Sequence, residues 1–317
     1  MQNDHATDWL NGTDWAQWRR DPMTGDASAR RYERLHGPNG NTVILMDAPP
    51  ETCGSQAAFV DIAAHLRALG LCAPQVLAWD DARGLMILQD LGQTDFARHL
   101  RASPQDETLL YTAAVDVLRA LQSAPAPAAL TRMTPDVGAD MIDLAFEWAA
   151  RDTSTDLSDQ IKDLLRNLLQ QVDPNPSVLS LRDFHAENLI WRGGETGLSR
   201  IGLLDFQDAF VTHPAYDLAS LLRDARRDVD PALTDPMIAR LGGDDPAFKT
   251  AFHVMAVQRN LRILGIFERL ERRDGKSGYR ALVPRVVDHL RTDLAAPELA
   301  ALGPLVHRAF DLGGTPA

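Results

Sequence analysis

Two short segments carry most of the chemical information in this chain: LRDFHAEN at residues 181–188, and LLDFQD at residues 203–208. Asp183 and Asn188 lie five positions apart, at the two ends of one loop, and Asp205 follows Asp183 by 22 positions. That distance allows a hairpin to bring Asp205 back beside the loop. Two carboxylates and an amide oxygen are hard ligands, which suit Mg²⁺ and suit zinc or copper poorly. Phosphoryl transfer uses such a set, with metal ions on the phosphates and a carboxylate that orients the attacking hydroxyl.

A single Asp in a loop more often caps a helix or accepts backbone hydrogen bonds than it performs chemistry. The ordered set is more specific, because D-x-x-x-x-N followed by D-F after a pair of strands matches the catalytic and metal-binding loops of protein kinases. His185 and His213 could join Asp183 in a transition-metal site, but no third histidine or cysteine lies near them in the sequence. We therefore do not expect such a site.

The segment before residue 90 has a strand-rich pattern. A helix over 5–20 containing three tryptophans is expected to cover a core, and strand-like runs at 31–36 and 42–46 flank the turn GPNGN, whose Asn-Gly pair favours a hairpin. Apolar residues at helical spacing predict a helix over 56–69. Two further strands are expected at 75–79 and 85–89. The predicted order is two strands, a helix and two strands.

Helices dominate the rest of the chain. They are predicted over 94–101, 104–123, 136–151 and 157–172, and again from residue 215 almost to the end, with 248–270 the longest. One strand-rich interruption covers 178–192 and 200–205. The pattern predicts an α+β protein with a small β-rich N-terminal lobe over 1–90 and a larger helical lobe over 91–317. The hinge would lie near 89–92, and ligand sites favour such boundaries.

Composition limits the partners of this 317-residue protein. Its formal net charge of −12 argues against nucleic acid or an anionic membrane as the main partner. Cys53 and Cys72 are its only cysteines, too few for a disulfide framework, which favours a reducing cytoplasm. The chain has no run of 18 apolar residues and no apolar signal-peptide region near its start, so we expect a cytoplasmic protein. No pattern indicates an oligomeric state.

These residues resemble the aminoglycoside phosphotransferase and choline kinase superfamily. Within it, the chain is most similar to the anomeric kinases of cell-wall recycling, which phosphorylate N-acetylmuramate and N-acetylglucosamine. The resemblance covers residues 25–224, about two thirds of the chain. The matching stretches are GDAS at 25–28 with RRY at 30–32, LMDAPPE at 45–51, DLG at 90–92, RDFHAENL at 182–189, DFQDA at 205–209 and YDLASLLRD at 216–224. The resemblance implies a bilobal protein-kinase-like fold.

The resemblance also implies roles in the helical lobe and the metal loop. Asp183 would be the catalytic base that accepts the hydrogen bond of the acceptor hydroxyl. Asn188 and Asp205 would hold Mg²⁺ against the phosphates of ATP. Asp217 would be structural and would connect the catalytic loop to the following helix. Leu181 stands where the family usually has histidine, and leucine can preserve the packing while it loses a polar contact.

The nucleotide would bind the N-terminal lobe. Backbone groups of Gln89 to Leu91 would pair with adenine, and the loop with Gly25 and Ser28 would cover the phosphates. This loop has one glycine instead of the three of G-x-G-x-x-G, so it is a weak signal by itself.

The lobe lacks the lysine that protein kinases use for the α- and β-phosphates. All but three of the 32 basic side chains are arginines, and no lysine precedes Lys162. We expect Arg30 or Arg31 to reach the phosphates instead, positioned by Asp61 or Asp47. The alternative is that both arginines are solvated residues at a strand edge.

The sequence therefore predicts an ATP- and Mg²⁺-dependent kinase that transfers the γ-phosphoryl group to the anomeric hydroxyl of a small amino sugar. The product would be a sugar 1-phosphate. The helices after residue 224 would form much of the acceptor pocket. An N-acetylmuramate site would require an arginine for the lactyl carboxylate, and Arg223, Arg226 and Arg227 are the candidates.

Two other functions stay open on the sequence. An aminoglycoside, choline or homoserine kinase is the first, and for a polycationic acceptor Asp224, Asp228 and Asp230 could line an acidic pocket, unless they are a solvated helix end. The second is a pseudokinase that binds nucleotide or a protein without turnover. The missing lysine favours this reading, whereas the intact set of Asp183, Asn188 and Asp205 opposes it.

Overall fold

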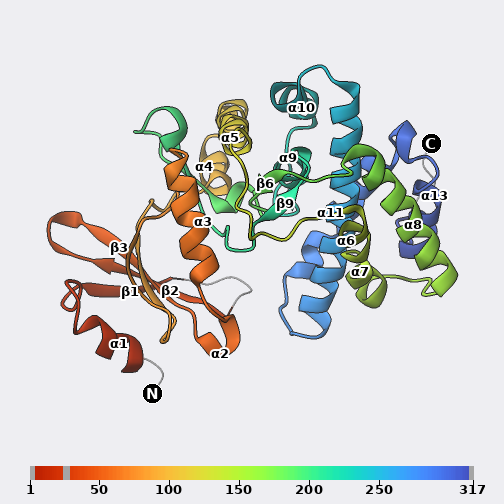
Figure 1. The fold of residues 1–317 in the computed structure, drawn as a ribbon. Helices are drawn as coiled ribbons and strands as arrows, with labels where there is room; N and C mark the ends of the chain where they lie inside the picture. Colours follow the sequence, from red (N-terminus) through yellow and green to blue (C-terminus); the bar gives the residue numbers. More distant parts are fainter. Residues whose placement is uncertain (1–3, 24–28, 314–317) are drawn as a thin grey trace. The chain divides into compact units, whose positions relative to one another are not determined.

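The computed structural model describes residues 4–23 and 29–313, which form two compact units (Figure 1). Unit 1 contains residues 1–95 and 189–208, and unit 2 contains residues 96–188 and 209–317. The sequence predicts a division at residue 90. The structure groups five more residues with the N-terminal part and adds the later segment 189–208 to it.

A five-stranded antiparallel sheet forms the centre of unit 1, in the order β1-β2-β3-β5-β4. Four of its strands were predicted, and the Asn-Gly turn between two of them has the expected positive φ angles at Asn39 and Gly40. The strands are β1 (Arg19–Met23), β2 (Arg31–His36), β3 (Thr42–Asp47), β4 (Val76–Asp80) and β5 (Leu85–Gln89). Short helices α1 (Asp4–Leu10) and α2 (Pro50–Cys53) and the longer α3 (Ala57–Ala68) complete this part.

The predicted helix over residues 5–20 is wrong beyond Leu10, because the chain turns and enters β1 at Arg19. β1 pairs with β2 from Arg19 opposite His36 to Met23 opposite Tyr32. It is an edge strand with exposed or half-buried side chains, and it tolerates Pro22 for that reason. Its polar sequence has no alternation of apolar residues, so periodicity could not reveal it.

Side chains alternate across the sheet and form two apolar layers. On one face, α1 packs its Ala6 and Leu10 against buried residues of β2, β3 and β5. Trp9, Trp15 and Trp18 close this cluster at its edge. This confirms the predicted role of the tryptophan-rich start as core cover, although most of it is not helical. α3 buries a separate apolar face formed by Phe59, Ile62, Ala63 and Leu66.

The second segment of unit 1 is a hairpin of β7 (Leu189–Trp191) and β8 (Ile201–Leu203), paired from Leu189 opposite Leu203 to Trp191 opposite Ile201. Backbone hydrogen bonds attach both strands to the N-terminal part. The Leu203 N–H donates to the Cys72 carbonyl at 2.8 Å, and the Trp191 N–H donates to the Thr94 carbonyl at 2.8 Å. The hairpin is therefore part of the sheet-containing unit, although it lies far along the sequence.

Unit 2 is mainly helical and is built around the long helix α11 (Pro246–Arg272), which packs against helices on several sides (Figure 1). A two-stranded sheet of β6 (Val178–Ser180) and β9 (Phe210–Thr212) lies in the same unit. The other α-helices are α4 (Phe96–Ala102), α5 (Glu107–Gln122), α6 (Pro135–Asp140), α7 (Asp143–Trp148), α8 (Thr155–Val172), α9 (Ala215–Leu222), α10 (Thr234–Gly242), α12 (Val283–Leu294) and α13 (Gly303–Phe310).

The predicted helix over 136–151 is two helices, α6 and α7. The two halves pack against different partners, α6 against α8 and α7 against α11, and the chain turns between them. The other helices predicted in this part of the chain occur at or near the expected positions. Short 3₁₀ turns connect these elements, and several of them lie where helix was predicted. They are Pro38–Gly40 (η1), Pro104–Asp106 (η2), Ala186–Asn188 (η3), Gly197–Arg200 (η4), Pro231–Leu233 (η5), Tyr279–Leu282 (η6) and Pro297–Leu299 (η7).

Candidate active site

The loop between β6 and β7 holds Asp183 and Asn188 in a tight backbone arrangement. Arg182 has a left-handed backbone with φ of 71°, which is unusual for a residue with a side chain. The Asn188 side-chain amide donates to the Asp183 carbonyl at 2.9 Å. This bond joins the two ends of the loop. It directs the amide nitrogen of Asn188 into the loop, so Oδ1 is the atom of this side chain that could bind a cation.

Asp217 fixes the start of the loop. Its carboxylate, only 1% exposed, accepts hydrogen bonds from the Ser180 hydroxyl at 2.7 Å, the Leu181 N–H at 2.7 Å and the Arg182 N–H at 3.0 Å. Burial raises the pKa of Asp217 to about 6, although these donors favour the ionised form. The contacts match the structural role that the resemblance implies. They also hold Arg182 in its strained conformation.

A second buried acid, which the sequence analysis did not single out for this role, supports the middle of the loop. Asp224 accepts from the Ala186 N–H at 3.2 Å and from the Arg226 N–H at 2.8 Å. Burial raises its pKa. His185, the residue before Ala186, is also buried, and burial with the nearby Arg226 and Arg259 lowers the pKa of this imidazole well below its usual value, which keeps it neutral. His185 is therefore a packed core residue of the loop.

The carboxylate of Asp183 differs from these two acids. It is half-buried and accepts no hydrogen bond from any side chain or N–H group that the structure describes. A general base needs this arrangement, because its lone pairs must be available to the proton of the acceptor hydroxyl. Asp217 and Asp224 fix the backbone of the loop, and Asp183 presents its carboxylate from that fixed backbone.

Asp205 lies in unit 1, two residues after the end of the β7–β8 hairpin that begins directly after Asn188. It has a left-handed backbone with φ of 57°, and its carboxylate accepts from the Gln207 amide at 2.9 Å. The next residue, Phe206, is fully buried and stacks on Phe59 of α3 with ring centroids 4.8 Å apart. This packing anchors the segment while it directs Asp205 away from the core.

Tyr32 of β2 connects Asp205 to one of the candidate phosphate-binding arginines. Burial raises the pKa of Tyr32 to about 12, and Arg30, Asp205 and Cys53 all lie close enough to affect this hydroxyl electrostatically. A candidate metal ligand and a candidate phosphate-binding residue are thus neighbours of one side chain within unit 1. Spacing in the sequence could not predict this proximity, because Tyr32 and Asp205 are 173 positions apart.

The two candidate arginines have different partners. Arg31 donates from its guanidinium to Asp47 at 2.7 Å, which is one of the two acids expected to position it. Arg30 donates to the Gln56 amide oxygen at 3.2 Å, and Gln56 is 2% exposed. The predicted loop residues Gly25 and Ser28 lie outside the described residues.

The predicted hinge begins at the end of β5. Gln89 ends this strand, and its N–H donates to the Gln75 carbonyl at 2.8 Å, while Leu91 is buried. Between them, Asp90 forms a buried ion pair with Arg34 of β2 at 2.6 Å. Burial alone would raise the pKa of Asp90, but hydrogen bonds from Arg34, the Gly92 N–H and Thr42 lower it. The hinge is thus rigidly attached to the sheet, by a contact the sequence analysis missed.

The arginines and acids proposed for an acceptor pocket already have partners in unit 2. Arg223 forms a bidentate pair with Asp293 at 2.8 Å, Arg226 pairs with Glu187 at 3.1 Å, and Arg227 pairs with Glu107 at 2.5 Å. The three acids also have partners. Asp224 accepts a hydrogen bond from the Ala186 N–H, and Asp228 pairs with Arg285. Asp230 caps a 3₁₀ turn. These six residues therefore support the fold in the described structure.

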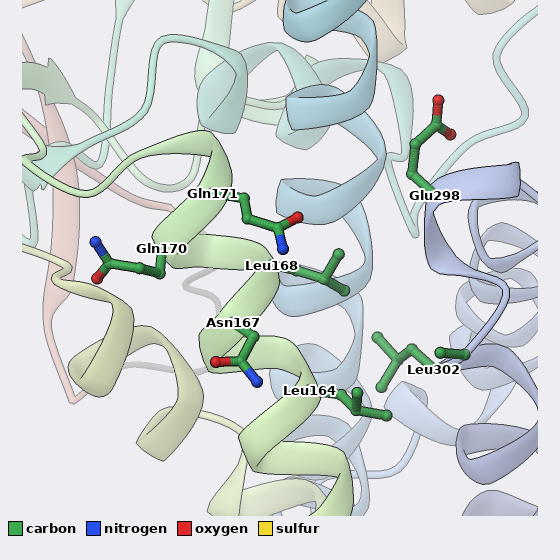
Figure 2. A pocket seen from close by; sticks show the side chains of 8 residues that line it. Leu164, Asn167, Leu168, Gln170, Gln171, Glu298 and Leu302 are labelled. Atoms are coloured by element: carbon green, nitrogen blue, oxygen red, sulfur yellow. The ribbon is translucent and has the colours of Figure 1, made fainter.

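A cavity of about 460 Å³ opens at the surface of unit 2, between α8 and the segment near α13 (Figure 2). In the close view, Asn167 and Gln171 come from α8, and Glu298 and Leu302 come from the opposite side. Its other lining residues are Leu164, Leu168, Gln170 and Ala301. None of the predicted catalytic, metal or nucleotide residues lines it, so it is not the candidate active site.

Known proteins are similar to this chain in sequence and in fold. Residues 21–252 match the family described as "phosphotransferase enzyme family". The chain belongs to this phosphotransferase family. It is 37% identical to an N-acetylmuramate/N-acetylglucosamine kinase of Caulobacter vibrioides, over 93% of each chain, and 34% identical to an enzyme of that name in Pseudomonas aeruginosa, over 90% of this chain and 87% of the other.

Among solved structures, a choline/ethanolamine kinase family protein from Mesorhizobium loti superposes with a TM-score of 0.66. It is 16% identical and the match covers 97% of this phosphotransferase and 99% of that chain. At this identity the likeness concerns the fold alone, and it confirms the predicted bilobal, protein-kinase-like class. Family membership and the kinase relatives make this phosphotransferase an ATP-dependent kinase that acts on a hydroxyl group. Within residues 4–23 and 29–313, no helix combines the length and apolar character needed to cross a bilayer.

Proposed function

We propose that this phosphotransferase transfers the γ-phosphoryl group of ATP to the anomeric hydroxyl of N-acetylmuramate and N-acetylglucosamine. The two sugars are those in the names of its relatives. The observation that carries the proposal is identity of 37% and 34% to kinases of that name, over nearly the whole length of each chain. The sugar 1-phosphate so formed would be the substrate of a nucleotidyl-transfer reaction.

Asp183 is the proposed catalytic base. Its carboxylate is free of hydrogen bonds from the described residues, and the backbone beneath it is held by Asp217 and Asp224. In this role it accepts the hydrogen bond of the anomeric hydroxyl and orients the oxygen for attack on the γ-phosphorus. The hydroxyl proton passes to Asp183 as the new O–P bond forms and the bond to ADP breaks.

Asn188 and Asp205 are the proposed Mg²⁺ ligands, because an amide oxygen and a carboxylate are the oxygen ligands that this cation prefers. The hydrogen bond from the Asn188 amide to the Asp183 carbonyl supports this assignment, since it determines which end of the amide could bind. When bound, the ion would neutralise charge on the phosphate oxygens. No lysine precedes Lys162, so any side-chain positive charge at this site comes from arginine.

Arg30 and Arg31 are the proposed replacements for the missing lysine. The proximity of Arg30 and Asp205 to Tyr32 favours Arg30, while Arg31 is held by Asp47. We predict that Arg30→Ala raises the Kd of Mg-ATP by about 10-fold, the usual effect of losing one charge-assisted hydrogen bond. Arg31→Ala is expected to have a smaller effect. Isothermal titration with a non-hydrolysable ATP analogue measures both, with exposed Arg83→Ala as the matched control. If both variants bind as tightly as wild type, neither arginine is the replacement.

The function is tested by incubating the protein with Mg-ATP and one acceptor at a time: N-acetylmuramate, N-acetylglucosamine, choline, homoserine or kanamycin. Phosphorus NMR then identifies the product. A phosphorus signal coupled to the anomeric proton of either sugar supports the proposal. A phosphate ester of kanamycin, choline or homoserine would contradict the proposal and show that the enzyme phosphorylates that compound instead. Firm ATP binding without any product would favour a pseudokinase.

A further inference from the structure

Three arginines of unit 2 gather beside the proposed catalytic base. Arg259 and Arg262 lie three positions apart on α11, on the same face of that helix. Arg182 belongs to the catalytic loop, and its guanidinium lies over the Phe210 ring, 5.8 Å from the centroid. All three act electrostatically on the buried hydroxyl of Tyr216, as does Asp183. In Figure 1, α9, which carries Tyr216, lies beside α11, and the two helices are in extensive contact.

None of these three arginines has an ion-pair or side-chain hydrogen-bond partner among the residues that the structure describes. Asp217 and Asp224 accept backbone N–H groups, and they act on Arg259 electrostatically without forming a salt bridge with it. Asp183 acts electrostatically on Arg262 without forming a salt bridge with it. This part of unit 2 therefore contains positive charge that no neighbouring carboxylate neutralises at close range.

Arg259 and Arg262 differ in their access to solvent. Arg259 is only 3% exposed, and its Nη1 atom is buried without a partner. Arg262 is partly buried, and burial lowers the pKa of its guanidinium, yet part of the side chain stays exposed. A charge that is desolvated without a partner is costly to the folded state. A small anion can reach Arg262 and offset that cost, whereas it cannot reach Arg259 without displacing the packing.

We infer that Arg262 binds a carboxylate of the phosphoryl acceptor and thereby makes the enzyme prefer acidic sugars. The inference rests on the proposed function, in which the acceptor hydroxyl meets Asp183, the electrostatic neighbour of Arg262. N-acetylmuramate differs from N-acetylglucosamine in a lactyl ether that ends in a carboxylate. A guanidinium matches a carboxylate with two parallel hydrogen bonds. Arg262 is therefore the proposed partner of the lactyl carboxylate. The three arginines that the sequence suggested for this role, Arg223, Arg226 and Arg227, already form ion pairs with other carboxylates.

The test compares the two sugars as substrates of one variant. Arg262→Gln removes the charge while it keeps a polar side chain of similar reach. At saturating Mg-ATP, we expect its kcat/KM for N-acetylmuramate to fall by about 10- to 100-fold, the effect of losing a charge-assisted pair. The value for N-acetylglucosamine should stay within about threefold of wild type. Arg262→Lys, which keeps the charge without the planar fork, should recover part of the loss.

The second sugar serves as the folding control, because retained turnover of N-acetylglucosamine requires an intact active site. Arg240→Gln, an exposed arginine of α10 paired with Asp116, is the matched control and should leave the ratio of the two kcat/KM values unchanged. An equal loss on both sugars would overturn the inference and indicate that Arg262 acts on Asp183 or on the transferring phosphoryl group. No loss on either sugar would also overturn it. A wild-type protein that phosphorylates neither sugar would contradict the proposed function itself, and this inference with it.

Discussion

At the scale of single residues, the catalytic loop could be recognised from the sequence because its chemistry is local. Asp183 and Asn188 are five positions apart, and a loop of that length fixes their relation without help from the rest of the fold. The residues that sequence reasoning missed act across long separations. Asp224 reaches Ala186 over 38 positions, and Arg34 reaches Asp90 over 56. No rule of sequence spacing predicts such long-range pairs. In a single sequence, an acid that will be buried cannot be told apart from a polar residue that will be exposed.

The role of Asp183 leads to a prediction that separates binding from turnover. Asp183→Ala should lower kcat by about 10³-fold, within the range that a positioned general base contributes, because it removes the acceptor of the hydroxyl proton. The Kd of Mg-ATP should stay within about twofold of wild type. Steady-state kinetics and calorimetric titration measure the two quantities. Asp163→Ala, which removes an exposed carboxylate of α8 paired with Arg166, is the control. Unaltered turnover in Asp183→Ala would refute the proposed mechanism.

At the scale of helices and strands, the sequence predicted elements that have an apolar period and missed those that lack one. β2, β3, β5 and α3 follow the expected pattern, whereas β1 is polar at nearly every position. The break between α6 and α7 was missed for another reason. The break depends on the helices against which the two halves pack, α8 for one half and α11 for the other. The sequence of the segment alone does not indicate these packing partners.

Helix α8 ends on an unfavourable charge. Asp173 follows its last turn, where the helix dipole disfavours an anion, and its Oδ2 is buried without a hydrogen-bond partner. Burial raises its pKa to about 6. Ionisation of Asp173 thus costs more free energy in the folded protein than in the unfolded chain. The resulting penalty is absent below about pH 4 and complete above about pH 6, so it makes the protein less stable as the pH rises between them.

Replacing this carboxyl should remove the penalty. We predict that Asp173→Asn stabilises the protein by about 1–2 kcal/mol at pH 8, after allowance for solvent screening of a partly exposed group. At pH 4 the variant and the wild type should unfold at the same denaturant concentration. Urea unfolding followed by circular dichroism at both values of pH measures the difference. Asp159→Asn, on the exposed surface of the same helix, provides a comparison. A gain of equal size at both pH values would exclude titration of Asp173 as its cause.

The crossing of α7 and α11 depends on one glycine. A Cβ atom at Gly265 would lie 2.3 Å from the Leu144 carbonyl carbon and 2.5 Å from the Ala145 nitrogen, both of them backbone atoms that cannot move aside alone. Alanine would improve helix propensity by about 1 kcal/mol, but the clash separates the helices. We predict that Gly265→Ala lowers the free energy of unfolding by about 3 kcal/mol or more. Gly194→Ala, in open space, should change it by less than about 0.5 kcal/mol. An unchanged stability in Gly265→Ala would mean that the helices do not cross so closely.

At the scale of the whole molecule, composition and fold lead to a proposal for where each substrate binds. Because lysine is nearly absent, the proposed nucleotide site relies on metal and arginine. The proposed nucleotide residues belong to unit 1, apart from Asn188, and the proposed acceptor residues belong to unit 2. The amino-sugar acceptor was predicted from the resemblance to known kinases, and the relatives of that name support it. The arginine proposed to bind its carboxylate could not be predicted, because the sequence does not show which of the 29 arginines lack a partner after folding.

The proposed nucleotide site predicts that the binding of ATP depends on a metal ion. Mg-ATP at 100 times its Kd should stabilise the protein by about 2.7 kcal/mol, since a ligand that binds only the folded state stabilises it by mass action. Chelation of the metal with EDTA should remove most of that gain, and Asp205→Asn should reduce it in the presence of metal. Thermal unfolding with and without each ligand measures the effect. A nucleotide-induced gain that persists in EDTA would contradict a site built on Asn188 and Asp205.

The tryptophan cover of the sheet makes the two units spectroscopically distinct. Trp9, Trp15 and Trp18 pack on the core of unit 1, and only Trp148 lies in unit 2. The far-ultraviolet circular dichroism of the protein arises mostly from the helices of unit 2, whereas its intrinsic fluorescence arises mostly from unit 1. Unfolding curves from the two signals therefore report on different parts of one chain. Their coincidence or separation would reveal whether the units unfold as a single cooperative system.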